Sequence, residues 1–419
     1  TQGNYNHLFL NDDMSPMILG LNEIGYDVFN LGNHEFNFGM NKLNDFINQT
    51  NDNLNVLCAN LYKDGNRVLN PYMIKTLENG VKVAVIGVVS PWITKWDAAN
   101  LVGYESKNPT EEVTKVIAEI KAAGGADLYV VSAHVGLTSE YGGGDSATDI
   151  ANANPEVSAI VMGHSHEKKA GIKVNNAIVV QPGNNGADLG KIDITLEKTE
   201  EGYKVIESSS SNLSTKGKAV DEELQSKLSS YHNRAINDAR GVIGKLDKSL
   251  ADENEVKGIP QSLVEDQGVT DFVNEVQLYN SAKYLEGLGI ESNSGYNVSG
   301  AALFDANSNM FAGDITKAAV SNIYKYDNKL YIIKTNGKQL KRYMEWTASI
   351  YNQFKTGDLT VSLNEDIRLY QYDMFDGITY DINISKPAGK RIENLYFRMC
   401  FHLILYLEFS GLFYYSVIK

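Results

Sequence analysis

The sequence predicts an α/β protein built from two domains, and three observations support this fold class. The chain has 419 residues, which is too long for one hydrophobic core of ordinary size. Its first half alternates apolar, strand-like runs with amphipathic helical patterns. Near residue 200 the amino-acid composition changes to a Ser-rich segment, and a second α+β region follows from about residue 241.

The composition is that of a globular protein with an acidic balance. Hydrophobic residues make up 43% and charged residues 21%, which excludes an intrinsically disordered chain. The 38 basic and 52 acidic residues give a net charge of −14. We therefore expect no polymeric nucleic acid and no anionic membrane as a partner, because few cations are present to neutralise phosphates. A small phosphorylated ligand remains compatible, since bound metal ions can supply local positive charge.

Strands and a capped helix are recognisable in the first half. The run VKVAVIGVV (81–89) is rich in β-branched residues and typical of a buried strand. Residues 108–125 predict a helix, because Pro109 and acidic residues open the segment and a pair of glycines ends it. The next strands are expected at 126–133 and 157–163, which together predict a mixed or parallel sheet covered by helices.

Domain boundaries follow from the change in texture. The Ser-rich stretch 201–218 predicts an exposed hairpin or linker, and 219–240 has apolar residues at the spacing of a connecting helix. We place the first domain at 1–205, the linker and connecting helix at 206–240, and the second domain at 241–397.

The C-terminal segment 398–419 is crowded with aromatic and aliphatic residues and has almost no turn signals. A membrane span is one interpretation, but His402 and Glu408 lie inside the only window of about 20 residues, which argues against it. We expect an aberrant hydrophobic tail and no membrane partner.

Four of the seven histidines fall in three short motifs. These motifs are GNHE (32–35), SAHVG (132–136) and GHSHE (163–167), and each directly follows an apolar, strand-like run. Ligands of open α/β sheets gather at the carboxyl ends of the strands, so we expect the motifs to converge on one site. His164 and His166 lie two apart in a loop, so both rings can face one point. Imidazole nitrogens and an Asn oxygen form a sensible mixed donor set for a divalent metal.

The alternative is that these are separate loop histidines, each satisfied by its own neighbours. That interpretation is the simpler one for any single histidine, whereas three strand-end motifs together favour a shared site. Glu35 and Glu167 follow the candidate ligands and are expected to support the loops. The motifs contain no carboxylate suited to bridging two ions, which a hydrolytic two-metal centre needs.

In this order, GNHEF, SAHVG and GHSHE resemble the motifs of the calcineurin-like metallophosphoesterases, and more closely those of the bacterial 5′-nucleotidase branch. The resemblance runs from Thr1 to Phe397. It implies an N-terminal β-sandwich flanked by helices, a connecting helix and a C-terminal α+β nucleotide-binding domain. It also implies two divalent metal ions in the first domain, with Mn, Zn, Co and Fe all compatible.

The resemblance implies roles residue by residue. Asn33, His134 and His164 would bind one metal ion, and His166 would bind the other. His34 would not be a ligand; it would stabilise the charge that builds on the phosphoryl oxygens and assist the leaving group.

Two motifs of the family do not occur in this sequence: an Asp-x-His after the first strand and a Gly-Asp after the second. In relatives a Gln-Gly segment follows that Gly-Asp, and here Gln2 and Gly3 open the chain. We therefore expect the sequence to begin just past the carboxylates that complete both metal shells.

The amino-acid sequence of 370–397 resembles that of the 2′,3′-cyclic-nucleotide 2′-phosphodiesterase/3′-nucleotidase subgroup. The segments 91–97 and 343–354 resemble the same subgroup. The alternative interpretation of 370–397 is a strand-rich core segment. The stretch 292–316, which corresponds to a Gly-rich, Arg-containing segment of 5′-nucleotidases, has no Arg. The resemblance thus implies hydrolysis of 2′,3′-cyclic nucleotides to 3′-nucleotides, and then to nucleoside and phosphate.

Enzymes of this subgroup hold the base between two aromatic rings, and stacking is worth ~1–3 kcal/mol per base. Tyr326 matches the first ring's segment, although Asp327 replaces the usual Pro or Gly, and a strand-edge tyrosine is the alternative. Tyr296 is a second substrate-binding candidate. The other ring's stretch should follow Phe397, where RMCFHLIL stands instead, so we expect a frameshift or a wrongly joined end there.

Two rival functions stay open. A 5′-nucleotidase or nucleotide-sugar hydrolase would share the first domain, and an inactive nucleotide-binding remnant would release no phosphate. The resemblance implies a monomer that acts on nucleotides in the periplasm, the cell wall or the extracellular space, because relatives are exported.

Overall fold

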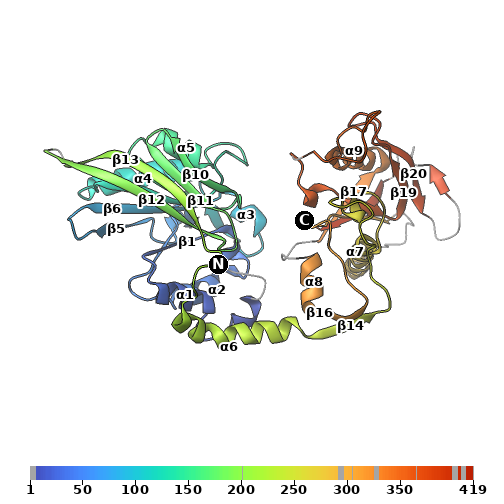
Figure 1. Cartoon of the computed structure of the whole chain (residues 1–419), viewed down its shortest axis with the longest axis horizontal. Coiled ribbons are helices and arrows are strands. Elements are labelled where there is room, and N and C mark those ends of the chain that lie inside the picture. Colours follow the sequence, from blue (N-terminus) through green and yellow to red (C-terminus); the bar gives the residue numbers. More distant parts are fainter. Residues whose placement is uncertain are drawn as a thin grey trace. The chain divides into compact units, whose positions relative to one another are not determined.

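The computed structural model describes residues 6–200, 202–290, 297–303, 305–324, 330–364, 366–398, 404–406 and 412–418. Residues 6, 398, 404–406 and 412–418 are described as backbone only. The chain divides into two compact units, Thr1–Asn233 and Arg234–Lys419. Both units mix helices with strands, so the predicted two-domain α/β class is confirmed (Figure 1).

The first unit carries the three histidine motifs. In chain order its elements are η1 (Asn6–Phe9), α1 (Pro16–Ile24), β1 (Val28–Asn30), η2 (Asn33–Phe36), α2 (Gly39–Ile47), β2 (Asn55–Leu57), β3 (Leu61–Lys63), β4 (Asn66–Arg67), β5 (Tyr72–Thr76), β6 (Lys82–Val89), α3 (Ile93–Trp96), β7 (Tyr104–Ser106), α4 (Pro109–Ala122), β8 (Leu128–His134), α5 (Ala147–Ala153), β9 (Val157–Met162), β10 (Lys168–Val174), β11 (Ala177–Pro182), β12 (Asp188–Thr199), β13 (Gly202–Ser214) and α6 (Glu222–Ala239), which runs into the second unit.

A six-stranded sheet forms the centre of this unit, in the order β10-β11-β9-β8-β6-β5. The four inner strands are parallel, whereas β10 and β5 join the edges in antiparallel fashion. The predicted mixed sheet is therefore confirmed, with β6, β8 and β9 at the expected positions. Strands β8 and β9 end at the same edge of this sheet, which brings SAHVG and GHSHE together; GNHE follows β1, which pairs with β2 in a separate two-stranded sheet.

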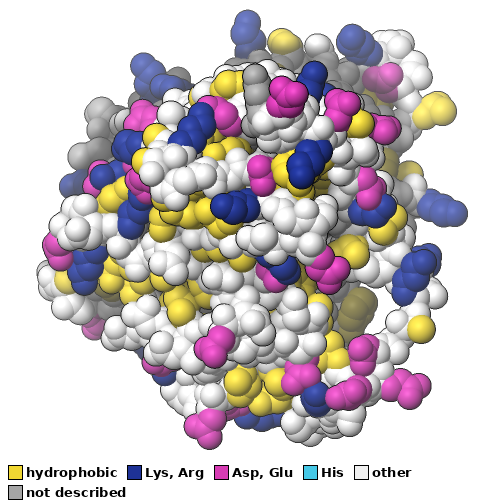
Figure 2. Space-filling view, turned by 90° about the vertical axis from the view of Figure 1, so that its left-hand side faces the viewer, with side chains coloured by type: hydrophobic (Ala, Val, Ile, Leu, Met, Phe, Trp, Pro, Cys, Tyr) yellow, Lys and Arg dark blue, Asp and Glu magenta, His cyan; other side chains and the backbone are white. Residues whose placement is uncertain are grey.

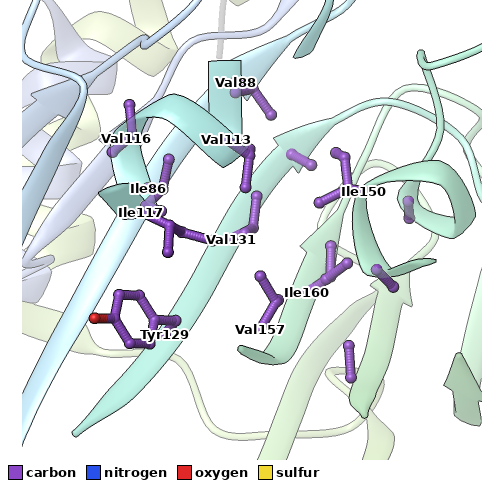
Figure 3. Close-up of a cluster of buried hydrophobic side chains, with 14 of the residues drawn as sticks. Ile86, Val88, Val113, Val116, Ile117, Tyr129, Val131, Ile150, Val157 and Ile160 are labelled. Carbon is purple, nitrogen blue, oxygen red and sulfur yellow. The ribbon is translucent and has the colours of Figure 1, made fainter. Parts of the chain in front are cut away.

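Helices α4 and α5 cover one face of the sheet. Val113, Ile117 and Ile150 from these helices pack on Val131 and Ile160 of β8 and β9 (Figure 3). Burial of these branched side chains gives the sheet its main hydrophobic stabilisation.

Helix α4 also confirms the predicted start signal. Asn108 accepts hydrogen bonds from the backbone N–H groups of Thr110 and Glu111, and Pro109 occupies the first turn. The cap satisfies donors that the first turn of a helix leaves without an intrahelical partner.

Strands β12 and β13 form a long hairpin that packs on the sheet edge. Ser210 bridges to this edge: its Oγ donates to the carbonyl of Val179 and accepts from the N–H of Gly171, at 2.7 and 2.8 Å. Asn212 donates to the carbonyls of Lys169 and Gln181. The segment 201–218, expected as an exposed hairpin or linker, supplies one strand of a hairpin, β13, whose partner β12 precedes the segment. Because β13 pairs with β12 to its end, the first unit continues past the boundary predicted at residue 205.

The second unit is α+β, and helix α6 fits the connecting helix predicted over 219–240. Its further elements are β14 (Val242–Leu246), η3 (Gln261–Leu263), α7 (Gly268–Gly287), β15 (Asn297–Ala301), β16 (Gly313–Thr316), α8 (Lys317–Ile323), β17 (Leu330–Asn336), α9 (Gly337–Thr347), η4 (Ala348–Ile350), η5 (Leu369–Gln371), β18 (Met374–Asp376), β19 (Ile378–Ile382), β20 (Ile392–Arg398), β21 (Ile404–Tyr406) and β22 (Leu412–Ile418). The C-terminal segment contributes the backbone of β22, which lies between β17 and β15.

Arg391 holds the core of the second unit together. Its side chain is 2% exposed, and its guanidinium donates to the carbonyls of Ala348 and Tyr351, both at 2.8 Å. Its backbone N–H donates to Glu345. A buried cation is tolerated here because each of these groups is satisfied by hydrogen bonds.

The surface agrees with the composition. On the face shown in Figure 2, acidic and basic side chains lie interspersed among apolar ones, without a broad patch of one sign. Among the residues that the structure describes, no helix is both long enough and apolar enough to cross a bilayer.

Candidate active site

The three histidine motifs meet at the carboxyl edge of the central sheet. His134 is the last residue of β8, and the GNHE and GHSHE motifs follow β1 and β9. The N–H of Gly163 donates to the carbonyl of Ala133 at 3.1 Å, which ties the start of GHSHE to the end of β8.

Two glycines allow the close approach around His134. A methyl group added at Gly32 would lie 2.8 Å from Cε1 of the His134 ring, and one added at Gly163 would lie 2.9 Å from its Nδ1. Both distances are shorter than side-chain contacts allow. Glycine directly before Asn33 and before His164 lets the imidazole pack against the backbone, and a methyl group at either position would have to displace the ring.

The candidate ligand atoms face one another. Oδ1 of Asn33 lies 2.9 Å from Nε2 of His134, although the two residues are 101 positions apart in the chain. The rings of His134 and His164 have their centroids 5.4 Å apart. Burial, and after it the charge of His164, lowers the pKa of His134 to about 3. At neutral pH the His134 imidazole is therefore uncharged, which is the form that binds metals.

His166 belongs to the same cluster. Its pKa is lowered by burial and by the charges of His164 and His34. His164 and His166 both have left-handed backbone conformations, with φ of 68° and 57°. Such conformations are uncommon outside glycine and cluster at functional sites. The strained turn points to a binding role for this loop.

His34 lies next to Asn33 on η2 and is held by a polar network. Its Nδ1 is 2.8 Å from Oδ1 of Asn37. The amide nitrogen of Asn37 donates to both carboxylate oxygens of Asp97, at 3.1 and 3.2 Å. The expected loop support from Glu35 is also present, because its Oε2 accepts from the N–H of Gly32 at 2.7 Å.

Aromatic side chains surround His164. Its ring stacks on Trp96 with centroids 5.3 Å apart, and Tyr141 packs against both Trp92 and Trp96. Oε2 of Glu140 lies 3.2 Å from Nε2 of His164.

The loop that carries Glu140 and Tyr141 is held by a buried carboxylate. Asp145, 5% exposed, accepts from the backbone N–H of Tyr141 at 2.8 Å and from the hydroxyl of Ser139. Sequence patterns assigned no role to Glu140, Tyr141, Asn37 or Asp97, although Asn37 directly follows GNHEF and Asp97 ends the segment 91–97. For Glu140 and Tyr141 the local signal was that LTSEYGGGD directly follows SAHVG.

The donor set fits a divalent cation. Oδ1 of Asn33 and Nε2 of His134 lie 2.9 Å apart, an ordinary hydrogen-bond distance, and both are atoms of the kinds that bind divalent ions. Over the ranges that the structure describes, no three His, Cys, Asp or Glu side chains are grouped to hold an ion by themselves. The candidate set combines imidazole nitrogens with the amide oxygen of Asn33.

The two substrate-binding candidates, Tyr296 and Tyr326, lie outside the described residues.

Comparison with known families decides the assignment. The profile of the calcineurin-like phosphoesterases matches residues 5–168, and that of the 5′-nucleotidase C-terminal domain matches 242–401. The chain is a calcineurin-like phosphoesterase with a 5′-nucleotidase C-terminal domain. The resemblance inferred from the motifs is thus confirmed, and this family of phosphoesterases implies divalent metal ions.

Curated relatives of this phosphoesterase include the trifunctional nucleotide phosphoesterase protein YfkN of Bacillus subtilis, 30% identical over 89% of the chain. The 2′,3′-cyclic-nucleotide 2′-phosphodiesterase/3′-nucleotidase of Salmonella typhimurium is 27% identical over 92% of the chain. The chain spans 27% of the first relative's length and 67% of the second's.

Solved structures share the fold of the phosphoesterase. A Staphylococcus aureus protein in complex with alpha-ketoglutarate aligns over 100% of the chain and 79% of its own, with 23% identity and a TM-score of 0.77. The YfkN structure is 30% identical over 56% of the chain and 78% of its own, with a TM-score of 0.51.

Proposed function

We propose that this phosphoesterase hydrolyses 2′,3′-cyclic nucleotides to 3′-nucleotides, and then releases nucleoside and phosphate. The observation that carries the proposal is the meeting of Asn33, His134 and His164 at one sheet edge, with His34 beside them. The names of the relatives support nucleotides as the substrate class.

We assign the metal-binding role to four residues. Asn33, His134 and His164 would hold one divalent ion, and His166 would contribute to a second. When bound, such ions neutralise phosphoryl charge and activate water. The His134 imidazole suits that role because its pKa of about 3 leaves it neutral at pH 7, with a lone pair for coordination.

We assign His34 the role of a catalytic residue that does not bind metal. It adjoins the ligand Asn33 on η2, and its Nδ1 is engaged with Asn37. A protonated imidazole in this place would donate a hydrogen bond to a phosphoryl oxygen and hold a proton for the departing ribose oxygen.

The second unit would bind the nucleoside part of the substrate. Tyr326 and Tyr296 are our candidates for stacking on the base, which every base permits through its π-face. We further infer that the protein is a monomer. We also infer that it acts in the periplasm, the cell wall or the extracellular space, and cell fractionation of the native host would test this location.

The deciding experiment is phosphate release by the full chain with added Mn²⁺ or Zn²⁺. We expect faster release from 3′-AMP than from 5′-AMP, and conversion of 2′,3′-cyclic AMP to 3′-AMP by chromatography. The variant His34→Ala should lose the activity, whereas Asp45→Asn, at an exposed pair with Lys42, should retain it. No release with either ion would reject the proposal.

One alternative has its own support. A Vibrio cholerae 5′-nucleotidase is 36% identical, although over only 37% of the chain. If 5′-AMP proves the better substrate, this 5′-nucleotidase function replaces the proposed one.

A further inference from the structure

A buried polar chain leads away from His34. Nδ1 of His34 meets Oδ1 of Asn37 at 2.8 Å, and the Asn37 amide nitrogen donates to Asp97. Asp97 is 7% exposed. It directly follows α3 and lies 60 positions after Asn37 in the chain.

The carboxylate sets the orientation of the Asn37 amide. An ionised carboxylate only accepts hydrogen bonds, so the NH₂ group of Asn37 has to face Asp97 and the carbonyl has to face His34. A carbonyl also only accepts. Nδ1 of His34 must therefore carry the proton of the neutral ring, so Nε2 is the nitrogen that would gain and lose the second proton.

A second amide reinforces this arrangement. Asn100 donates to Oδ1 of Asp97 at 3.3 Å and to the backbone carbonyls of Phe36 and Asn37 at 3.1 and 2.9 Å. Both acceptor directions of the carboxylate are thus used by amide donors. Asn100 also fastens the turn that carries Asn37 to the loop after α3.

We infer that Asn37 and Asp97 are positioning residues that hold His34 as its Nδ1–H tautomer. The role in catalysis rests on the proposed function of His34, whereas the tautomer does not. Asp97 acts at a distance, through the orientation of one amide. Its counterpart Asn37 transmits that orientation to the imidazole.

The first test reads the tautomer without any substrate. Two-bond proton–nitrogen NMR correlations of the nitrogen-15-labelled full chain distinguish Nδ1–H from Nε2–H imidazoles, and His34→Ala assigns the His34 signals. We expect the Nδ1–H pattern in the parent. In Asp97→Asn the residue at 97 can donate as well as accept, so Asn37 can turn over and the Nε2–H pattern should gain population. An unchanged pattern would overturn the inference.

The second test separates positioning from binding. Asp97→Asn should lower kcat by roughly tenfold to a hundredfold, as outer partners of catalytic groups do, and leave KM nearly unchanged. The exchange variant Asn37→Asp/Asp97→Asn restores an acceptor facing His34 and a donor behind it, so it should recover both the tautomer and kcat. The matched control Asp45→Asn should change neither.

The outcomes distinguish the two proposals. Loss of the Nδ1–H pattern in Asp97→Asn with undiminished kcat would reject the positioning role while leaving the phosphoesterase function standing. A parent that shows the Nδ1–H pattern but releases no phosphate would reject the proposed function alone. A rise in the KM of Asp97→Asn with kcat unchanged would also count against positioning.

Discussion

Two regions of the first unit bury ionisable side chains in opposite ways. At α4, the carboxylate of Glu112 is fully buried and meets the hydroxyl of Tyr62 at 2.6 Å, Arg67 at 3.1 Å and Lys115 at 2.6 Å. Burial raises the pKa of Glu112, but hydrogen bonds from Lys115, Tyr62 and Arg67 outweigh it, so the net pKa is lowered. This cluster satisfies its own charges.

The carboxyl edge of the central sheet instead gathers several imidazoles. His134 and His164 would both be cationic if protonated, and burial together with His164 holds the pKa of His134 at about 3, while Glu35 opposes the shift. The comparison separates a cluster that satisfies itself from one that we propose to be functional. Opposite charges complete each other at α4, whereas the neighbouring imidazoles lie beside Asn33 and Glu140, a mixture of groups that can bind a ligand from outside.

The largest expected effect comes from removing an imidazole of the sheet edge. In His164→Gly, activity should fall by about 10³-fold or more, since the site loses a candidate ligand. Stability should stay within about 1 kcal/mol of the parent, because glycine relieves the left-handed backbone at this position. Phosphate release and urea unfolding measure the two quantities.

The control for this variant is Asn185→Gly, at another residue with a left-handed backbone, φ of 55°, which is exposed in the connection between β11 and β12. It should keep full activity. A His164→Gly protein that retains turnover would show that His164 is a loop histidine without a role.

Breaking the α4 cluster should have the reverse effect. Arg67→Met leaves the Glu112 carboxylate short of one cation, so the free energy of unfolding should fall by roughly 3–5 kcal/mol. Activity per folded molecule should not change. Urea unfolding is the measurement, with Lys121→Met at the more exposed pair with Glu156 as the matched control, expected to cost less than about 1 kcal/mol.

If Arg67→Met abolished activity in the folded state, the α4 cluster would have to be counted as part of the site, and the contrast between the two regions would fail.

The pH dependence of stability should separate the regions in metal-free protein. Between pH 6.5 and about 3 the unfolded chain binds a proton at His134 that the folded chain excludes, so stability falls as pH falls through this window. Glu112 reduces stability only at lower pH. Because its folded pKa is lowered, the folded chain loses stability as pH falls below 4.5, the ordinary pKa of this carboxyl group.

Urea unfolding with EDTA at several pH values checks this order. The variant His134→Asn should flatten the curve between pH 6.5 and 4.5 and leave the steeper loss at lower pH. An unaltered curve would contradict the buried, neutral state of His134.

The smallest effect is expected from packing beside His134. In Gly163→Ala, the added methyl group has to displace the His134 ring, so activity should fall by about tenfold, which corresponds to ~1.4 kcal/mol. The control Gly20→Ala lies in helix α1 with no heavy atom within 4 Å of the added group. It should raise stability by ~0.5–1 kcal/mol and leave activity unchanged.

Much of the fold could be predicted from local patterns. The β-branched runs at β6, β8 and β9 and the Pro-opened helix α4 carry their structure in their own residues. The Ser-rich strand β13 was only partly predictable. Serines usually indicate exposure, whereas Ser210 attaches the hairpin to strands β10 and β11 through hydrogen bonds.

The sequence by itself determined which chemical groups stand at the strand ends, because strand periodicity and motif order are local properties. Only the tertiary structure decided which partners those groups meet: Asn33 with His134 across 101 positions, Asn37 with Asp97 across 60, and His164 with Glu140. Those contacts depend on how parallel strands align and on how loops of different length close over them. No pattern confined to neighbouring residues encodes that geometry.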